Sequence, residues 1–135
     1  MSITYTSANK ILDYNFGATS YVVPATYYVG LSTSVIGIDG TGETEPVGGA
    51  YARVAVTNNK TNFAVAALGA LTNATAITFV ESTTSWGTIT YVFLADAISG
   101  GNIYYFEALP VAKTVQTATT VLFSIGALTF SMSNS

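Results

Sequence analysis

General acid–base chemistry here would fall to the carboxylates, because the sequence has no histidine and no cysteine. Glu81, Asp96 and Glu107 lie near the ends of expected strands, and glycoside hydrolysis uses a pair of facing carboxylates. No local motif surrounds any of the three, and turn acids or partners of Arg53 are the ordinary alternative. We therefore expect no catalytic residue and no enzymatic activity.

A glycine-rich loop over residues 34–50 contains three further acids, Asp39, Glu43 and Glu45. Oxygen ligands in such a loop are reminiscent of calcium sites, but the ligand alternation and the closing glutamate of an EF-hand are missing. A solvated acidic loop is the expectation, with no metal and no cofactor.

Arg53 is the one arginine of the chain and falls within an expected strand. Its guanidinium cannot be neutralised, so an inward-pointing Arg53 must find a carboxylate or several carbonyl oxygens. We expect a structural clasp.

The composition constrains the partners. Charged residues make up 8% of the chain and hydrophobic residues 50%, whereas about a quarter of an ordinary soluble domain is charged. Part of the surface should therefore be covered by copies of the chain or by a protein partner. The net charge of −3, with only four scattered cations, argues against nucleic acid, and the longest apolar run, residues 63–71, is too short to span a membrane.

The expected elements are mostly strands. A short helix is predicted near residues 7–16, with Ser7 as its cap and Gly17 at its end. Threonine, valine and aromatic residues then predict strands over residues 21–23, 25–32, 51–57, 76–80, 87–95, 103–109 and 121–133. The turn at 99–102 predicts that strands 87–95 and 103–109 pair, while residues 63–71 fit either a strand or an irregular segment.

That hairpin is apolar at consecutive positions, so both of its faces should be covered. The second cover is either a neighbouring subunit or the helix or long loop. The candidate subunit or lattice contacts are Tyr91, Phe93, Tyr104, Tyr105 and Phe106. In the last strand, Leu128, Phe130 and Met132 alternate with polar residues, which predicts one buried face.

The nine tyrosines and Trp86 allow two interpretations. Aromatic faces can stack on sugar rings, and they also fill protein cores and subunit contacts. Core and contact are the expectation.

Several short motifs follow one another in order: YVGLST (28–33), GGAYAR (48–53), AITF (76–79), WGTIT (86–90), DA (96–97), SGGN (99–102) and KTV (113–115). Together, from about Leu12 to the end, they resemble small virion proteins of tailed phages and prophages, labelled tail fibre or minor structural protein. The resemblance implies a β protein of the virion surface without enzymatic activity, and supplies no defined binding site.

We expect one domain over residues 1–135, an all-β, jelly-roll-like sandwich with a short N-terminal helix. Because the sequence contains no heptad or Gly-X-Y shaft, the first expectation is a capsid decoration (cement) protein. It would bind itself, as a trimer, and the major capsid protein or another virion protein. The alternative is a tail-fibre or host-attachment component that binds carbohydrate.

Overall fold

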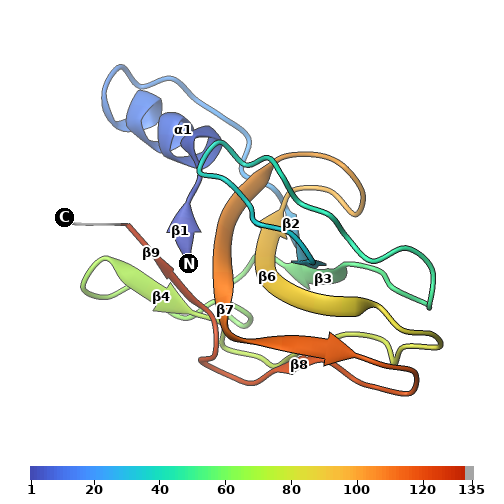
Figure 1. Ribbon diagram of the computed structural model, residues 1–135. Coiled ribbons are helices and arrows are strands. Elements are labelled where there is room, and N and C mark those ends of the chain that lie inside the picture. The colour runs from blue at the N-terminus through green and yellow to red at the C-terminus, as the bar shows by residue number, and fades with distance from the viewer. Residues whose placement is uncertain (133–135) are drawn as a thin grey trace.

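A computed structural model describes residues 1–132 of the chain (Figure 1). These residues form one helix, α1 (Tyr5–Asn15), and short strands on both sides of it in the sequence. The strands are β1 (Ser2–Ile3), β2 (Thr26–Ser32), β3 (Val54–Thr57), β4 (Ala70–Thr72), β5 (Ile77–Thr78), β6 (Gly87–Ala95), β7 (Ile103–Val115), β8 (Leu122–Phe123) and β9 (Thr129–Ser131).

The strands form one main sheet and two small ladders. The main sheet has five antiparallel strands in the order β1-β7-β6-β2-β3, while β4 pairs with β9 and β5 with β8. A mostly β chain with one short N-terminal helix is thus confirmed. The structure does not show a jelly-roll-like sandwich, because two ladders of two strands each stand where a second full sheet was expected.

Helix α1 begins earlier than predicted. Thr4, not Ser7, is the cap: its Oγ1 accepts a hydrogen bond from the Ser7 backbone N–H at 3.4 Å and donates to the Ile103 carbonyl at 2.7 Å. The cap therefore also fastens the helix to β7. The predicted C-terminal end of the helix is confirmed. Gly17 follows it with a φ of 123°, a backbone conformation that glycine adopts without steric strain. No helix within residues 1–132 is long and apolar enough to cross a membrane.

The β6–β7 hairpin matches its prediction closely. Gly100 and Gly101 adopt positive φ in the turn, as paired strands joined by a glycine turn require. Strand β7 runs further than predicted, to Val115. Tyr91 faces Ala108 and Ile89 faces Lys113, so residues 109–112 bulge out of the ladder.

Other predicted strands are shorter than expected. No strand covers residues 21–23, and β2 begins only after Pro24; residues 51–57 shorten to β3 and residues 76–80 to β5. The C-terminal strand is split into β8 and β9 by a turn in which the Ala127 N–H donates to the Ser124 carbonyl and Gly126 has a φ of 80°. Leu128 and Phe130 are buried as predicted.

The buried face of the C-terminal strand ends at Phe130. Met132 is 46% exposed, because it lies beyond the end of β9, so its expected burial is wrong. Position 133, the end of the predicted strand, lies outside the described residues.

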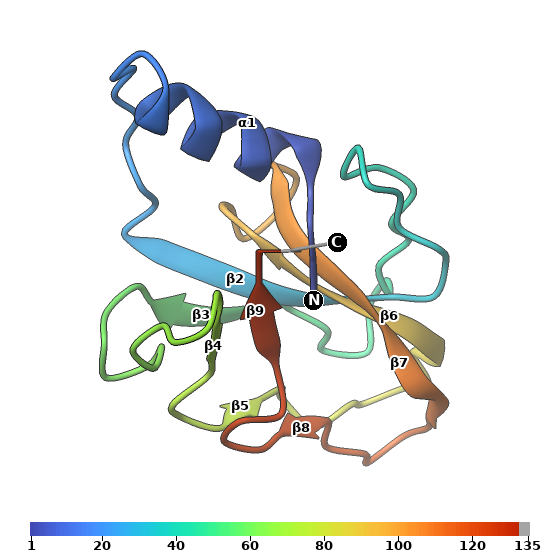
Figure 2. The ribbon, with the colours of Figure 1, turned by 90° about the vertical axis from the view of Figure 1, so that its left-hand side faces the viewer.

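The main core lies between the central sheet and the small ladders. Figure 2 shows α1 at one end of the sheet and the β5–β8 ladder at the opposite end. This core joins apolar side chains of β2 and β6 to those of β5, β9 and the loops around them, among them Leu31, Val92, Ile77, Phe79 and Phe130. A smaller cluster of Ile36, Phe93, Ala95 and Ile103 covers the other sheet face. The long loop, through Ile36, therefore covers that second face within the chain.

Candidate functional site

Arg53 lies immediately before β3, at the end of the long loop, and its side chain is 2% exposed. Its Nε and Nη2 each donate to one carboxylate oxygen of Glu45 at 2.9 Å, a two-point ion pair. Its Nη1 donates to the carbonyls of Ala97 at 2.6 Å and Gly100 at 2.9 Å. One guanidinium thus joins the long loop to the turn between β6 and β7.

The guanidinium also lies 5.0 Å from the ring centroid of Phe93, a cation–π distance. Phe93 faces Gly30 across the β2–β6 ladder, and its ring covers the place where a Cβ of residue 30 would stand. A methyl group there would come within 2.2 Å of the Phe93 ring. Glycine at position 30 therefore makes room for the ring on which Arg53 rests.

Tyr51 completes this cluster, which we call the Arg53 clasp (Arg53, Glu45, Tyr51 and Phe93). The Tyr51 hydroxyl donates to Glu45 Oε1 at 2.7 Å and accepts from the Leu31 N–H at 2.9 Å. Its hydroxyl thus connects the carboxylate that holds Arg53 to the middle of the main sheet.

The Tyr51 ring extends the clasp into the main core. It stacks on Phe79 and meets Trp86 edge to face, with centroids 6.3 and 5.3 Å away. Trp86 is buried and donates its indole N–H to the Gly49 carbonyl at 2.8 Å, so this tryptophan is a core residue and not a sugar platform. The long loop is consequently tied to the core from both Gly49 and Glu45.

The electrostatics of the clasp follow from its burial and its charges. Burial lowers the pKa of Arg53, but the hydrogen bonds and negative charge of Glu45 outweigh it and raise the pKa above its ordinary value. Burial raises the pKa of the Tyr51 phenol well above 10, because a phenolate would lack solvation there and would lie beside Glu45. Arg53 and Tyr51 therefore both keep their protons near neutral pH, which suits a structural role and not acid–base catalysis.

Three other carboxylates, Asp96, Glu107 and Asp39, have ordinary structural contacts. Asp96 accepts from the N–H and side-chain amide of Asn102, at 2.7 and 3.1 Å, and so braces its turn. Glu107 lies 4.0 Å from the N-terminal amine, and Asp39 accepts from Thr41. Among residues 1–132, no three histidine, cysteine or acidic side chains gather as a metal site.

The five predicted contact residues divide into two groups. Phe93 and Tyr104 are buried within the chain, and the Tyr104 hydroxyl accepts a hydrogen bond from Lys10 of α1 at 2.9 Å. Tyr91, Tyr105 and Phe106 keep part of their surface exposed. A contact with a neighbouring protein, which stays a prediction, would therefore use these three.

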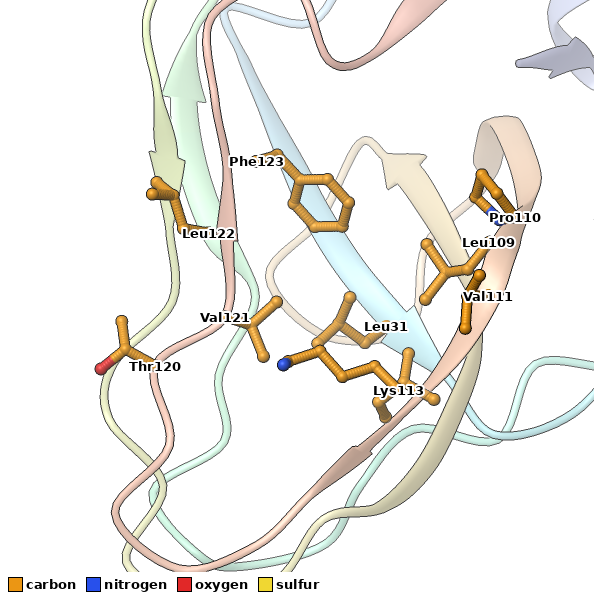
Figure 3. Close-up of a pocket in the computed structure, with 10 residues that line it drawn as sticks. Leu31, Leu109, Pro110, Val111, Lys113, Thr120, Val121, Leu122 and Phe123 are labelled. Carbon is orange, nitrogen blue, oxygen red and sulfur yellow. The ribbon is translucent and has the colours of Figure 1, made fainter.

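An apolar hollow of about 330 Å³ opens between the β7 bulge and the segment leading into β8. Figure 3 shows Phe123 and Val121 on one side and Leu109 and Val111 on the other, with the Lys113 amine reaching across toward Val121. No carboxylate lines it, so the hollow suits an apolar group and offers no acid–base pair.

Sequence reasoning missed two features. It placed Glu45 among solvated loop acids, whereas Glu45 is the ion-pair partner of Arg53. The two residues are eight positions apart in an irregular loop, so no periodic pattern in the sequence shows that they meet. It also left residues 63–71 undecided. Residues 65–69 of this run form an exposed turn between paired segments, whereas Phe63 at its start is buried, and only Leu68-Gly69 signals the turn.

The chain matches the model of one protein family, described as the podophage GP4 fiber I protein gp80, over residues 2–131. The chain belongs to this family. It is therefore a non-enzymatic structural component of a phage virion fibre. No curated protein matches the sequence.

This membership bears on the two functions expected from the sequence. It supports the alternative, a tail-fibre component associated with other virion proteins, and gives no support to the capsid decoration role expected first.

Proposed function

We propose that this chain is a docking component of the fibre, which holds its place by burying exposed apolar side chains against neighbouring virion proteins. The observation that carries this proposal is the amount of apolar side chain left in solvent by a protein with 8% charged residues. Val47, Val22 and Phe16 are 95%, 91% and 80% exposed. Exposed apolar side chains that gather into a patch mark a site of protein interaction.

The Arg53 clasp supports the same proposal in another way. It fixes the long loop, which carries exposed Val35, Ile38 and Val47, against the rigid main sheet. An apolar surface that is already ordered loses less conformational entropy on binding. We therefore propose that the clasp is structural and that the surface it holds is the functional part.

Phage particles lacking this chain test the proposal. They should have incomplete fibres and reduced adsorption to host cells, while their heads retain DNA at the same temperature and salt as the parent. Gold-labelled antibody against the chain should bind at the tail. Label over the head, together with heads that lose DNA earlier, would instead favour the capsid decoration role.

A second candidate is attachment to a host-surface carbohydrate. It is favoured by the aromatic group at the helix, where Tyr14, 58% exposed, meets Tyr21 edge to face at 6.4 Å and the Lys10 amine lies 5.9 Å from the Tyr21 ring. Such a group can stack on a sugar ring and donate a hydrogen bond to it. A glycan array should then show binding that Tyr14→Ala removes, whereas silence of the parent protein rejects this candidate.

A further inference from the structure

The most apolar segment of the chain lies outside its core. Residues 64–70, AVAALGA, contain no polar side chain and form a hairpin that we call the apolar hairpin. Val65 is 78% exposed and Leu68, at the tip, is fully exposed. Apolar side chains at such positions gain little from folding, and a group of them on one exposed turn suits a contact with another protein.

The apolar hairpin is nonetheless well ordered by backbone hydrogen bonds. The N–H of each of Ala67 and Ala70 donates to the carbonyl of the other, at 2.8 and 3.0 Å. The Ala64 N–H donates to the Thr72 carbonyl at 2.9 Å, and the Gly69 carbonyl accepts from the Met132 N–H at 3.0 Å. Leu68 is thus presented on a fixed turn.

Leu68 also has an unfavourable backbone conformation. Its φ is 53° and that of Gly69 is 76°, so both central residues of the two-residue turn are left-handed. Asparagine or glycine is the usual first residue of such a turn, and a leucine there is strained. The strain is not offset by packing within the chain, which again points to a contact outside it.

Beside this turn lies an apolar hollow of about 190 Å³. It is lined by Ala66, Gly69, Ala70, Leu71, Tyr105, Phe130, Ser131 and Met132. No charged side chain lines it. Its volume suffices for the four-carbon side chain of a leucine, since an apolar cavity of about 150 Å³ holds a benzene molecule.

We propose that the apolar hairpin is a pairing site for a second copy of this chain, with Leu68 of each copy seated in the hollow of the other. The same chain carries both the projecting leucine and an apolar hollow able to receive it. Because the two lie side by side on one hairpin, a two-fold axis next to it can satisfy both contacts at once. The proposal rests on the proposed function, since it names one partner of the exposed apolar surface.

The pair is weak when it is isolated. A contact built around one hairpin and one hollow buries less than the roughly 1,600 Å² of a standard interface, so we expect dissociation in the micromolar range or above. Copies held close together in a fibre would pair at much higher effective concentration. Charged ligands are disfavoured, because neither the apolar hairpin nor the hollow carries a charge to meet them.

Sedimentation of the purified chain over a range of concentrations tests the pair. The parent should form a dimer, and Leu68→Asp should raise the dissociation constant at least tenfold, because a carboxylate would enter an apolar hollow. Aspartate tolerates left-handed backbone better than leucine, so the turn should remain folded. Val111→Asp is the matched control, since Val111 is 80% exposed and lines no part of this hollow.

A charge-complementation experiment makes the test specific. Ala66→Lys places a cation at the hollow and should also prevent pairing alone. An equimolar mixture of Leu68→Asp and Ala66→Lys should pair again, because one contact then joins Asp to Lys and the other remains the parental one. The two-fold pair would be overturned by any of three results: the mixture does not pair, the parent is monomeric at all concentrations, or the parent forms a trimer.

The virion experiment keeps the two proposals distinguishable. If the parent chain is monomeric but particles lacking it still lose their fibres, the pair is rejected and the docking role stands. If particles lacking the chain keep their fibres and adsorb normally, the docking role is rejected whatever the sedimentation shows.

Discussion

The Arg53 clasp and the apolar hairpin use polarity in opposite ways. The clasp places the only arginine of the chain inside, with each of its three guanidinium nitrogens donating to Glu45 or to a carbonyl. The apolar hairpin places the middle of the longest apolar run outside, with Leu68 in contact with solvent. A chain with few charges has thus used one ion pair to organise its fold and left apolar groups on its surface.

The contrast separates two kinds of mutational effect. The clasp connects the long loop, the β6–β7 turn and the main sheet, so its loss should be measured in unfolding. The apolar hairpin is held by its own backbone hydrogen bonds, so changing its side chains should be measured in association. Stability measurements therefore test the clasp, and association measurements test the apolar hairpin.

Removing Arg53 should have the largest effect. Arg53→Ala leaves Glu45 and two carbonyls without their partner and should cost roughly 3 kcal/mol or more, or roughly 10 °C in Tm, because an unpaired buried charge is expensive. Calorimetry measures this. Lys113→Ala, an exposed cation, is the control and should melt like the parent. An Arg53→Ala melting point within a degree or two of the parent would contradict the structural role.

Filling position 30 should have the next largest effect. Gly30→Ala sets a methyl group within 2.2 Å of the Phe93 ring, and the ring must leave its place under Arg53. Overpacking of this kind costs about 1–3 kcal/mol. Urea unfolding should show this loss of stability. The double variant Gly30→Ala/Phe93→Leu should lose less free energy of unfolding than the sum of the losses in the two single variants. Additive losses would mean that the two residues are not coupled.

Alkaline pH should weaken the clasp by a smaller amount. The pKa of Tyr51 is raised in the folded protein, so above pH 10 the unfolded chain releases the phenolic proton while the folded chain keeps it. Stability from this group is complete below about pH 10 and then falls by up to about 1.4 kcal/mol per pH unit. Urea midpoints between pH 9 and 11 test this.

Tyr51→Phe provides the comparison, because its pH dependence should be flatter. Partly buried Tyr27, whose pKa is also raised, remains and should keep part of the slope. An unchanged slope in Tyr51→Phe would show that Tyr51 does not contribute.

The sequence predicted the local elements better than their assembly. Gly17 and the 99–102 turn fix a helix end and a hairpin through the backbone freedom of glycine, and both predictions are confirmed. The 87–95 strand, with apolar residues on both faces, was also predicted with its observed bounds. These features depend on a few neighbouring residues, which is why the sequence alone reveals them.

The features that sequence reasoning missed depend on distant residues. Whether a second full sheet forms depends on which short strands find partners, and β4 and β5 pair with C-terminal strands more than 40 residues away. The pairing of Arg53 was expected, but its partner Glu45 could be identified only once the loop was closed. Likewise, the sequence allowed either a strand or an irregular segment at residues 63–71, because nothing local to the run shows that Phe63 is buried and Leu68 exposed.

Relieving the backbone strain at Leu68 should have the smallest effect on stability. Leu68→Asn replaces a leucine at left-handed backbone by the residue that two-residue hairpin turns favour before glycine. We expect the free energy of unfolding to rise by about 1 kcal/mol, because the backbone strain is relieved and no internal contact is lost. We also expect self-association to weaken, because an amide replaces the apolar side chain of the pair. Urea unfolding at low concentration and sedimentation at high concentration measure the two effects separately. A variant that is less stable than the parent would show that Leu68 serves the fold, which would place the apolar hairpin in the same category as the clasp.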